Sequence, residues 1–116
     1  MLKPQELRER LKGMTVIVMT PFDDDDEIDY AGLKSNVAEL VGALKGKDAC
    51  LVASGSNSEF YALTDEERRR VIETVVDTVG GRLPVVAGTM EAGTKAPIHN
   101  NVDNSHCAVV PRGERL

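Results

Sequence analysis

The residues best suited to binding chemistry lie in the polar segment Gly55–Glu59, which follows the apolar run Ala49–Ala53. Gly55 lets a ligand approach the backbone closely, and Ser56 and Asn57 supply backbone amides together with side-chain hydrogen-bond donors. Such a group of donors suits a carboxylate or a phosphate. The spacing alone leaves an ordinary polar turn as an equal alternative.

Two other groups of residues raise the question of a metal site. Asp23–Asp26 carries oxygens of the kind that Mg²⁺ and Ca²⁺ bind, but it lacks the alternating spacing and later glutamate of an EF-hand loop, so a solvated turn is favoured. His99, His106 and Cys107 could bind zinc, yet zinc sites usually have four ligands at tighter spacing. The sequence therefore predicts neither a metal nor another cofactor.

Lysines matter because a βα-barrel enzyme can use a desolvated lysine as a Schiff-base nucleophile. The six lysines fall on expected helices or at their ends: Lys3, Lys12, Lys34, Lys45, Lys47 and Lys95. None lies within an apolar strand-like run. The sequence therefore predicts no catalytic nucleophile in this chain.

Three apolar runs, beginning near residues 15, 50 and 84, are the expected strands that position the loop. The run from Thr15 to Thr20 is apolar on both faces, which predicts a central parallel strand. Helices are expected from about Tyr30 to Leu44, with Asp29 as N-cap, and from Thr64 to the Gly80-Gly81 pair. This βαβαβ order predicts an α/β fold with a parallel sheet.

The pattern breaks in the last third of the chain. A third helix should run from about Glu91, but Pro97 falls where its interior should be. Cys107–Val110 resembles a fourth strand that arrives too soon after the third. We therefore expect residues 1–96 to form the βαβαβ part and residues 97–116 to form a disrupted tail.

Composition restricts the classes of function. The 116 residues carry a net charge of −5, which argues against a nucleic-acid surface, and the basic run Arg68–Arg70 is expected to pair with acidic neighbours. No apolar stretch approaches the roughly 20 residues that a membrane span needs. Met1–Lys12 is rich in charge, unlike a signal peptide, and the well-separated Cys50 and Cys107 suggest reduced, buried thiols. We expect a cytoplasmic protein.

Four motifs resemble the dihydrodipicolinate synthase / N-acetylneuraminate lyase family. They are Val18–Phe22, Glu27–Tyr30 with Leu33, Gly55–Thr64 and Pro84–Thr89. The resemblance implies that the chain is the N-terminal part, about the first four strands, of a (β/α)₈ TIM barrel. It also implies a lyase that joins a lysine to pyruvate or a related 2-oxo acid as a Schiff base, without a cofactor.

In this family the loop after the second strand usually has the pattern G-[ST]-T-G-E and holds the carboxylate of the 2-oxo acid. The resemblance therefore implies that Gly55, Ser56 and Asn57 bind that carboxylate. Asn57 stands where threonine is usual and Ser58 where glycine is usual. These departures leave the individual enzyme open, and a sugar-acid or hydroxy-oxoglutarate aldolase is an alternative to an enzyme of lysine biosynthesis. The family's lysine and tyrosine lie on later strands, so no catalytic residue is expected here.

Three hypotheses follow from these observations. The chain is a truncated or frame-disrupted lyase of this family that lacks Schiff-base activity by itself. Alternatively, it is a non-catalytic half-barrel that hides an open sheet edge by assembling with copies of itself, as a homo-oligomer, or with another chain. The third hypothesis is a small module that retains only the binding of small carboxylates.

Overall fold

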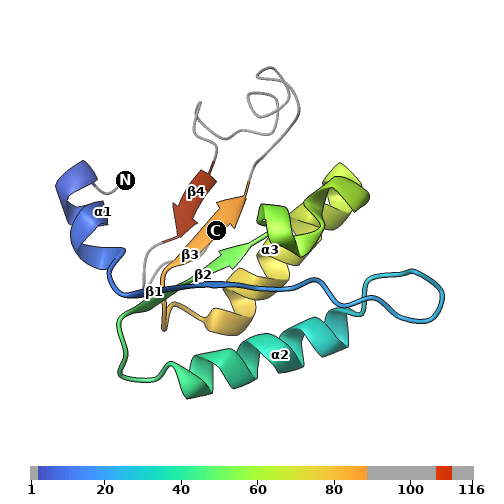
Figure 1. The fold of residues 1–116 in the computed structure, drawn as a ribbon, viewed down its shortest axis with the longest axis horizontal. Coiled ribbons are helices and arrows are strands. Elements are labelled where there is room, and N and C mark those ends of the chain that lie inside the picture. Colours follow the sequence, from blue (N-terminus) through green and yellow to red (C-terminus); the bar gives the residue numbers. More distant parts are fainter. Residues whose placement is uncertain (1–2, 89–106, 111–116) are drawn as a thin grey trace.

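Four strands, three α-helices and two short 3₁₀ turns make up the part of the chain that the computed structural model describes, residues 3–88 and 107–110 (Figure 1). In chain order they are α1 Pro4–Arg10, β1 Met14–Ile17, α2 Tyr30–Ala43, β2 Ala49–Ala53, η1 Ser56–Ser58, η2 Phe60–Ala62, α3 Asp65–Val79, β3 Val85–Gly88 and β4 Cys107–Val110. The third helix expected from about Glu91 and the domain boundary expected after residue 96 lie outside the described residues.

The strands form one sheet in the order β1-β2-β3-β4, and the first three are parallel. Their register places Val16 beside Leu51 and Leu51 beside Val85. Helices α2 and α3 lie together along one face of this sheet (Figure 1). Their buried side chains, such as Val37 and Val75, form a single core with Leu51 and Val85. The predicted βαβαβ architecture is therefore confirmed.

Capping interactions place the starts of both long helices where the sequence predicts them. The Asp29 carboxylate accepts a hydrogen bond from the Gly32 amide at 2.9 Å at the start of α2. At the start of α3 the Thr64 hydroxyl accepts from the Glu67 amide, and the Glu67 carboxylate accepts from the Thr64 amide. Gly80, with a left-handed φ of 58°, ends α3.

The fourth strand is present as predicted, but its direction corrects the expectation of a parallel sheet throughout. Strand β4 pairs antiparallel with β3, with Val110 opposite Val85 and Cys107 opposite Gly88. A parallel fourth strand would need a crossover, usually a helix, and the sequence around Pro97 is poor in helix-forming residues. An antiparallel partner needs only a reversal of the chain.

The position of β1 also differs from the prediction. Among the described strands it pairs with β2 alone and forms an edge of the sheet, so the expectation of a central strand buried on both faces is wrong. Val16 packs against the core, whereas Met14 is 58% and Ile17 38% exposed. The apolar character of both faces is real, but the described residues cover only one of them.

The structure bears on several smaller expectations, and it confirms those of a buried Cys50 and of an acidic partner for Arg68. Cys50 is buried and unbonded to another cysteine, and its Sγ lies 3.6 Å from the Thr15 hydroxyl. In the basic run, Arg68 pairs with Asp65 and the Arg70 guanidinium lies 4.0 Å from the centre of the Tyr30 ring. Within the described ranges, no helix combines the length and apolar character needed to cross a membrane.

Candidate carboxylate-binding site

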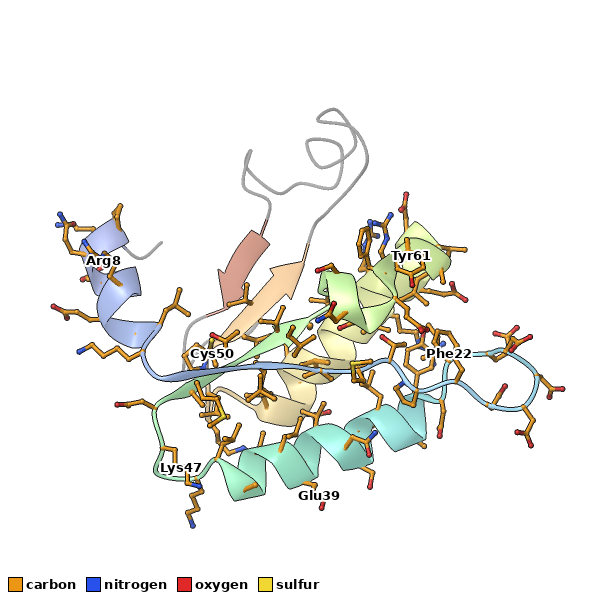
Figure 2. The ribbon with its side chains drawn as sticks, in the orientation of Figure 1. Arg8, Phe22, Glu39, Lys47, Cys50 and Tyr61 are labelled. Carbon is orange, nitrogen blue, oxygen red and sulfur yellow. The ribbon has the colours of Figure 1, made fainter. Side chains whose placement is uncertain are left out.

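The loop Gly55–Glu59 leaves β2 at its carboxyl end, the end at which parallel βα folds bind ligands. In Figure 2 this end lies towards Phe22 and Tyr61, whereas Cys50 marks the amino-terminal part of β2. The structure therefore places Gly55, Ser56 and Asn57 together at the end of the sheet where the sequence predicts them.

The loop presents hydrogen-bond donors that are free to meet a ligand. Gly55 is buried, and a β-carbon there would lie 3.1 Å from Val52 Cγ1, so the position favours glycine. Ser56 and Asn57 are exposed, and in the described part of the chain neither amide donates a backbone hydrogen bond. Together with the hydroxyl and the carboxamide, these amides form a set that a carboxylate can accept.

Two buried hydroxyls hold the loop against the end of β1. Ser58 Oγ donates to the Val18 carbonyl at 2.5 Å, and Thr20 Oγ1 donates to the Ser58 carbonyl at 2.9 Å. The pair ties together segments that lie far apart in the sequence, so the loop's position depends on β1. The sequence does not predict that Thr20 bonds to the loop, because in the sequence Thr20 is only the last residue of a strand-like run.

Ser54, which precedes the loop, has a left-handed φ of 55°. Its carbonyl oxygen lies so near the end of β3 that a β-carbon at Gly88 would be 2.0 Å away. Glycine is therefore required at position 88, and the carboxyl ends of β2 and β3 meet at Ser54. Sequence reasoning missed Ser54, because nothing in the local sequence signals its left-handed backbone or its contact with β3.

The acidic segment is a self-contained turn. Asp23 accepts hydrogen bonds from the amides of Asp25 and Glu27 at 2.9 and 3.0 Å, and Phe22 pairs with Ile28 across its base. In residues 3–88 and 107–110, no cluster of three His, Cys, Asp or Glu side chains is placed to hold a metal ion. The candidate zinc ligands His99 and His106 lie outside these ranges. For the third candidate, Cys107, the structure describes the backbone and not the side chain.

The lysines within the described ranges are all exposed: Lys3, Lys12, Lys34, Lys45 and Lys47. Lys95 lies outside these ranges. Of the two tyrosines, Tyr61 is largely exposed, whereas Tyr30 is half-buried beneath Arg70. Burial raises the pKa of the Tyr30 phenol, and the positive charge of Arg70 partly opposes this effect. Tyr30 therefore remains a neutral phenol that joins α2 to α3.

An apolar groove runs between β1 and α2, on the other side of β1 from its partner strand. Its lining includes Val16, Ile17 and Met19 from the β1 segment and Leu40 and Ala43 from α2. Ile17 and Met19 are 38% and 58% exposed, respectively. Large apolar side chains exposed along a sheet edge are typical of a surface that pairs with further chain.

Comparison with known proteins places these features in a family. A sequence model of the Dihydrodipicolinate synthetase family matches residues 10–104. The 4-hydroxy-tetrahydrodipicolinate synthase of Methanothermobacter thermautotrophicus is 43% identical over 79 residues, which are 68% of this chain and 27% of that enzyme. The dihydrodipicolinate synthase of Bacillus clausii superposes with a TM-score of 0.70 at 36% identity, over 80% of this chain and 30% of that one.

A third relative, the dihydrodipicolinate synthase of Acinetobacter baumannii, was solved in complex with pyruvate. It superposes with a TM-score of 0.68 at 28% identity, over 77% of this chain and 30% of that one. The chain thus spans between 27% and 30% of the length of these three relatives. It belongs to the dihydrodipicolinate synthase family of lyase-type synthases, and it matches the N-terminal portion of the family's TIM barrel.

Proposed function

We propose that this chain supplies the carboxylate-binding loop of a lyase that acts on pyruvate or a related 2-oxo acid. The observation that carries the proposal is the loop itself. Ser56 and Asn57 offer amides at the carboxyl end of β2 that are unpaired within residues 3–88 and 107–110, and the buried Ser58 and Thr20 hydroxyls hold them in place. Donors fixed before the ligand arrives bind a carboxylate at a lower entropic cost.

The reaction proposed for the site is the formation of a Schiff base between a lysine and the 2-oxo acid. Carbon–carbon bond formation or cleavage then follows. A nucleophilic lysine must be desolvated so that its amine is neutral, and each lysine in the described ranges is exposed. The sequence places Lys95, which the structure does not describe, on an expected helix and not within a strand-like run. We therefore propose that the lysine lies outside this chain, and that the chain binds substrate without forming the covalent bond. A cytoplasmic setting fits the unbonded Cys50 thiol.

Titration of the isotope-labelled chain with pyruvate, followed by its amide resonances, tests the proposal. We expect millimolar binding that shifts the Gly55, Ser56 and Asn57 amides and weakens severalfold in Ser56→Ala and in Asn57→Ala. Ser35→Ala, on the exposed side of α2, is the matched control and should bind like the wild type. Absence of shifts in this loop at saturating pyruvate would overturn the proposal.

Borohydride reduction in the presence of pyruvate tests the placement of the lysine separately. We expect no covalent adduct, measured by intact-mass spectrometry. A stable adduct on the chain would show that one of its own lysines is the nucleophile, and the proposal that the lysine lies elsewhere would then be wrong.

A second function is favoured by the exposed β1 edge and the groove beside it. We propose as the alternative a non-catalytic half-barrel that forms a homo-oligomer by covering this edge with a second copy. The exposed Met14, Ile17 and Met19 side chains support this alternative. Its test is the concentration dependence of the oligomeric state.

A further inference from the structure

The described part of the chain buries three polar side chains, and all three lie at the carboxyl ends of β1 and β2. They are Thr20, Ser54 and Ser58. The Thr20 and Ser58 hydroxyls have hydrogen-bond partners, as described above. Ser54 Oγ has none among the residues that the structure describes, although Ser54 is only 1% exposed. A buried hydroxyl without a partner lowers the stability of the folded state, and alanine at this position would remove that cost.

The backbone of Ser54 is a second destabilising feature at the same position. Its φ of 55° lies in the left-handed region that glycine adopts most readily. In this conformation the Ser54 carbonyl lies close against Gly88 of the neighbouring strand. Strained residues that persist in a fold are concentrated at active sites and ligand sites. Both features of Ser54 therefore need an explanation beyond folding.

We propose that Ser54 is a fourth binding residue, whose hydroxyl donates a hydrogen bond to a carboxylate oxygen of the 2-oxo acid held by Gly55, Ser56 and Asn57. This inference rests on the function proposed above. Ser54 directly precedes Gly55, at the sheet end where the unpaired amides of Ser56 and Asn57 lie. The ligand supplies the acceptor that the described residues lack, and a charged acceptor strengthens such a bond.

The Ser54→Ala variant tests this inference through two readouts that move in opposite directions. Without pyruvate, the free energy of unfolding in urea should stay the same or rise, because an unpaired buried hydroxyl is removed. With pyruvate, the dissociation constant from amide-resonance titration should rise by roughly tenfold. Ser54→Gly also relieves the left-handed backbone, so it should be the more stable variant and bind equally weakly.

The outcomes separate this inference from the proposed function. If Ser56→Ala weakens pyruvate binding and Ser54→Ala does not, Ser54 is not a binding residue, whereas the loop still is. If Ser54→Ala clearly lowers the stability of the ligand-free chain, its hydroxyl has a structural partner and the inference is wrong. If the wild-type chain shows no binding, the proposed function fails and this inference fails with it.

Discussion

Ser58 carries a hydroxyl at a loop position where the resemblance to the family implies glycine. That hydroxyl is buried and donates to the Val18 carbonyl at 2.5 Å, which no glycine could do. The Ser58 carbonyl in turn accepts from Thr20 at 2.9 Å. The departure from the family pattern therefore adds a bond between the loop and β1, and it leaves the donors of Ser56 and Asn57 in place.

Replacing Ser58 by alanine tests the importance of this bond. We expect the free energy of unfolding to fall by about 1–2 kcal/mol, because a buried side-chain hydrogen bond is lost. Circular dichroism during urea unfolding measures the change, since the chain has no tryptophan. Ser35→Ala, on the exposed side of α2, is the control and should change stability by less than about 0.5 kcal/mol. Equal effects of the two substitutions would contradict a special role for Ser58.

Tyr30 provides a prediction about pH. Burial raises the pKa of its phenol above the ordinary value, so the folded state binds the Tyr30 proton more tightly than the unfolded state does. Stability from this group is therefore fully present below the pKa of the unfolded state, near 10, and is lost as the pH rises through the higher folded pKa. Arg70 lowers this pKa, so Arg70→Gln should raise it further.

The ultraviolet absorbance of phenolate measures the titration of Tyr30 in a Tyr61→Phe background, because the chain has only two tyrosines. The folded chain should titrate at higher pH than the chain unfolded in urea. A lower midpoint in Arg70→Gln than in its parent would contradict the assigned role of Arg70.

Local signals were sufficient to predict helices α2 and α3. Asp29 and the Thr64/Glu67 capping box mark helix starts through residues only three positions apart, and the structure confirms both. The direction of β4 and the exposure of β1 could not be predicted, because each depends on a partner far away in the sequence. The same reasoning applies to the site. The loop was predicted from its own residues, whereas Ser54 stands out only through its burial, its left-handed backbone and its proximity to Gly88.

The capping box gives a prediction about helix α3. Thr64→Ala removes the hydroxyl that accepts from the Glu67 amide at 3.2 Å, and it should lower the free energy of unfolding by about 1 kcal/mol. The control is Thr74→Ala, a threonine-to-alanine substitution in the interior of α3. The Thr74 hydroxyl donates a hydrogen bond to the Arg70 carbonyl, and alanine is the better helix former at such a position. Thr74→Ala should therefore leave stability unchanged or raise it. Equal losses in the two variants would show that the cap has no special effect.

For the whole molecule, the decisive feature is a sheet with a covered face and an open edge. Helices α2 and α3 cover one face, and β1 ends the sheet with Met14 58% and Ile17 38% exposed. In a closed barrel no strand is an edge strand, so the surface that a complete barrel would bury is exposed here. The two proposed functions differ in what covers that surface: additional chain of a lyase, or a second copy of this chain.

Sedimentation velocity over a range of concentrations distinguishes them. If a second copy covers β1, the chain should associate reversibly, and Ile17→Lys should weaken association by at least about tenfold, because lysine on an edge strand opposes pairing. Ala38→Lys is the control, since it adds the same charge at an exposed α2 position that does not line the groove. Both variants should retain the circular dichroism of the wild type. A wild-type chain that stays monomeric at every concentration would exclude the self-associating half-barrel. The groove would then be assigned to contact with a further part of the lyase.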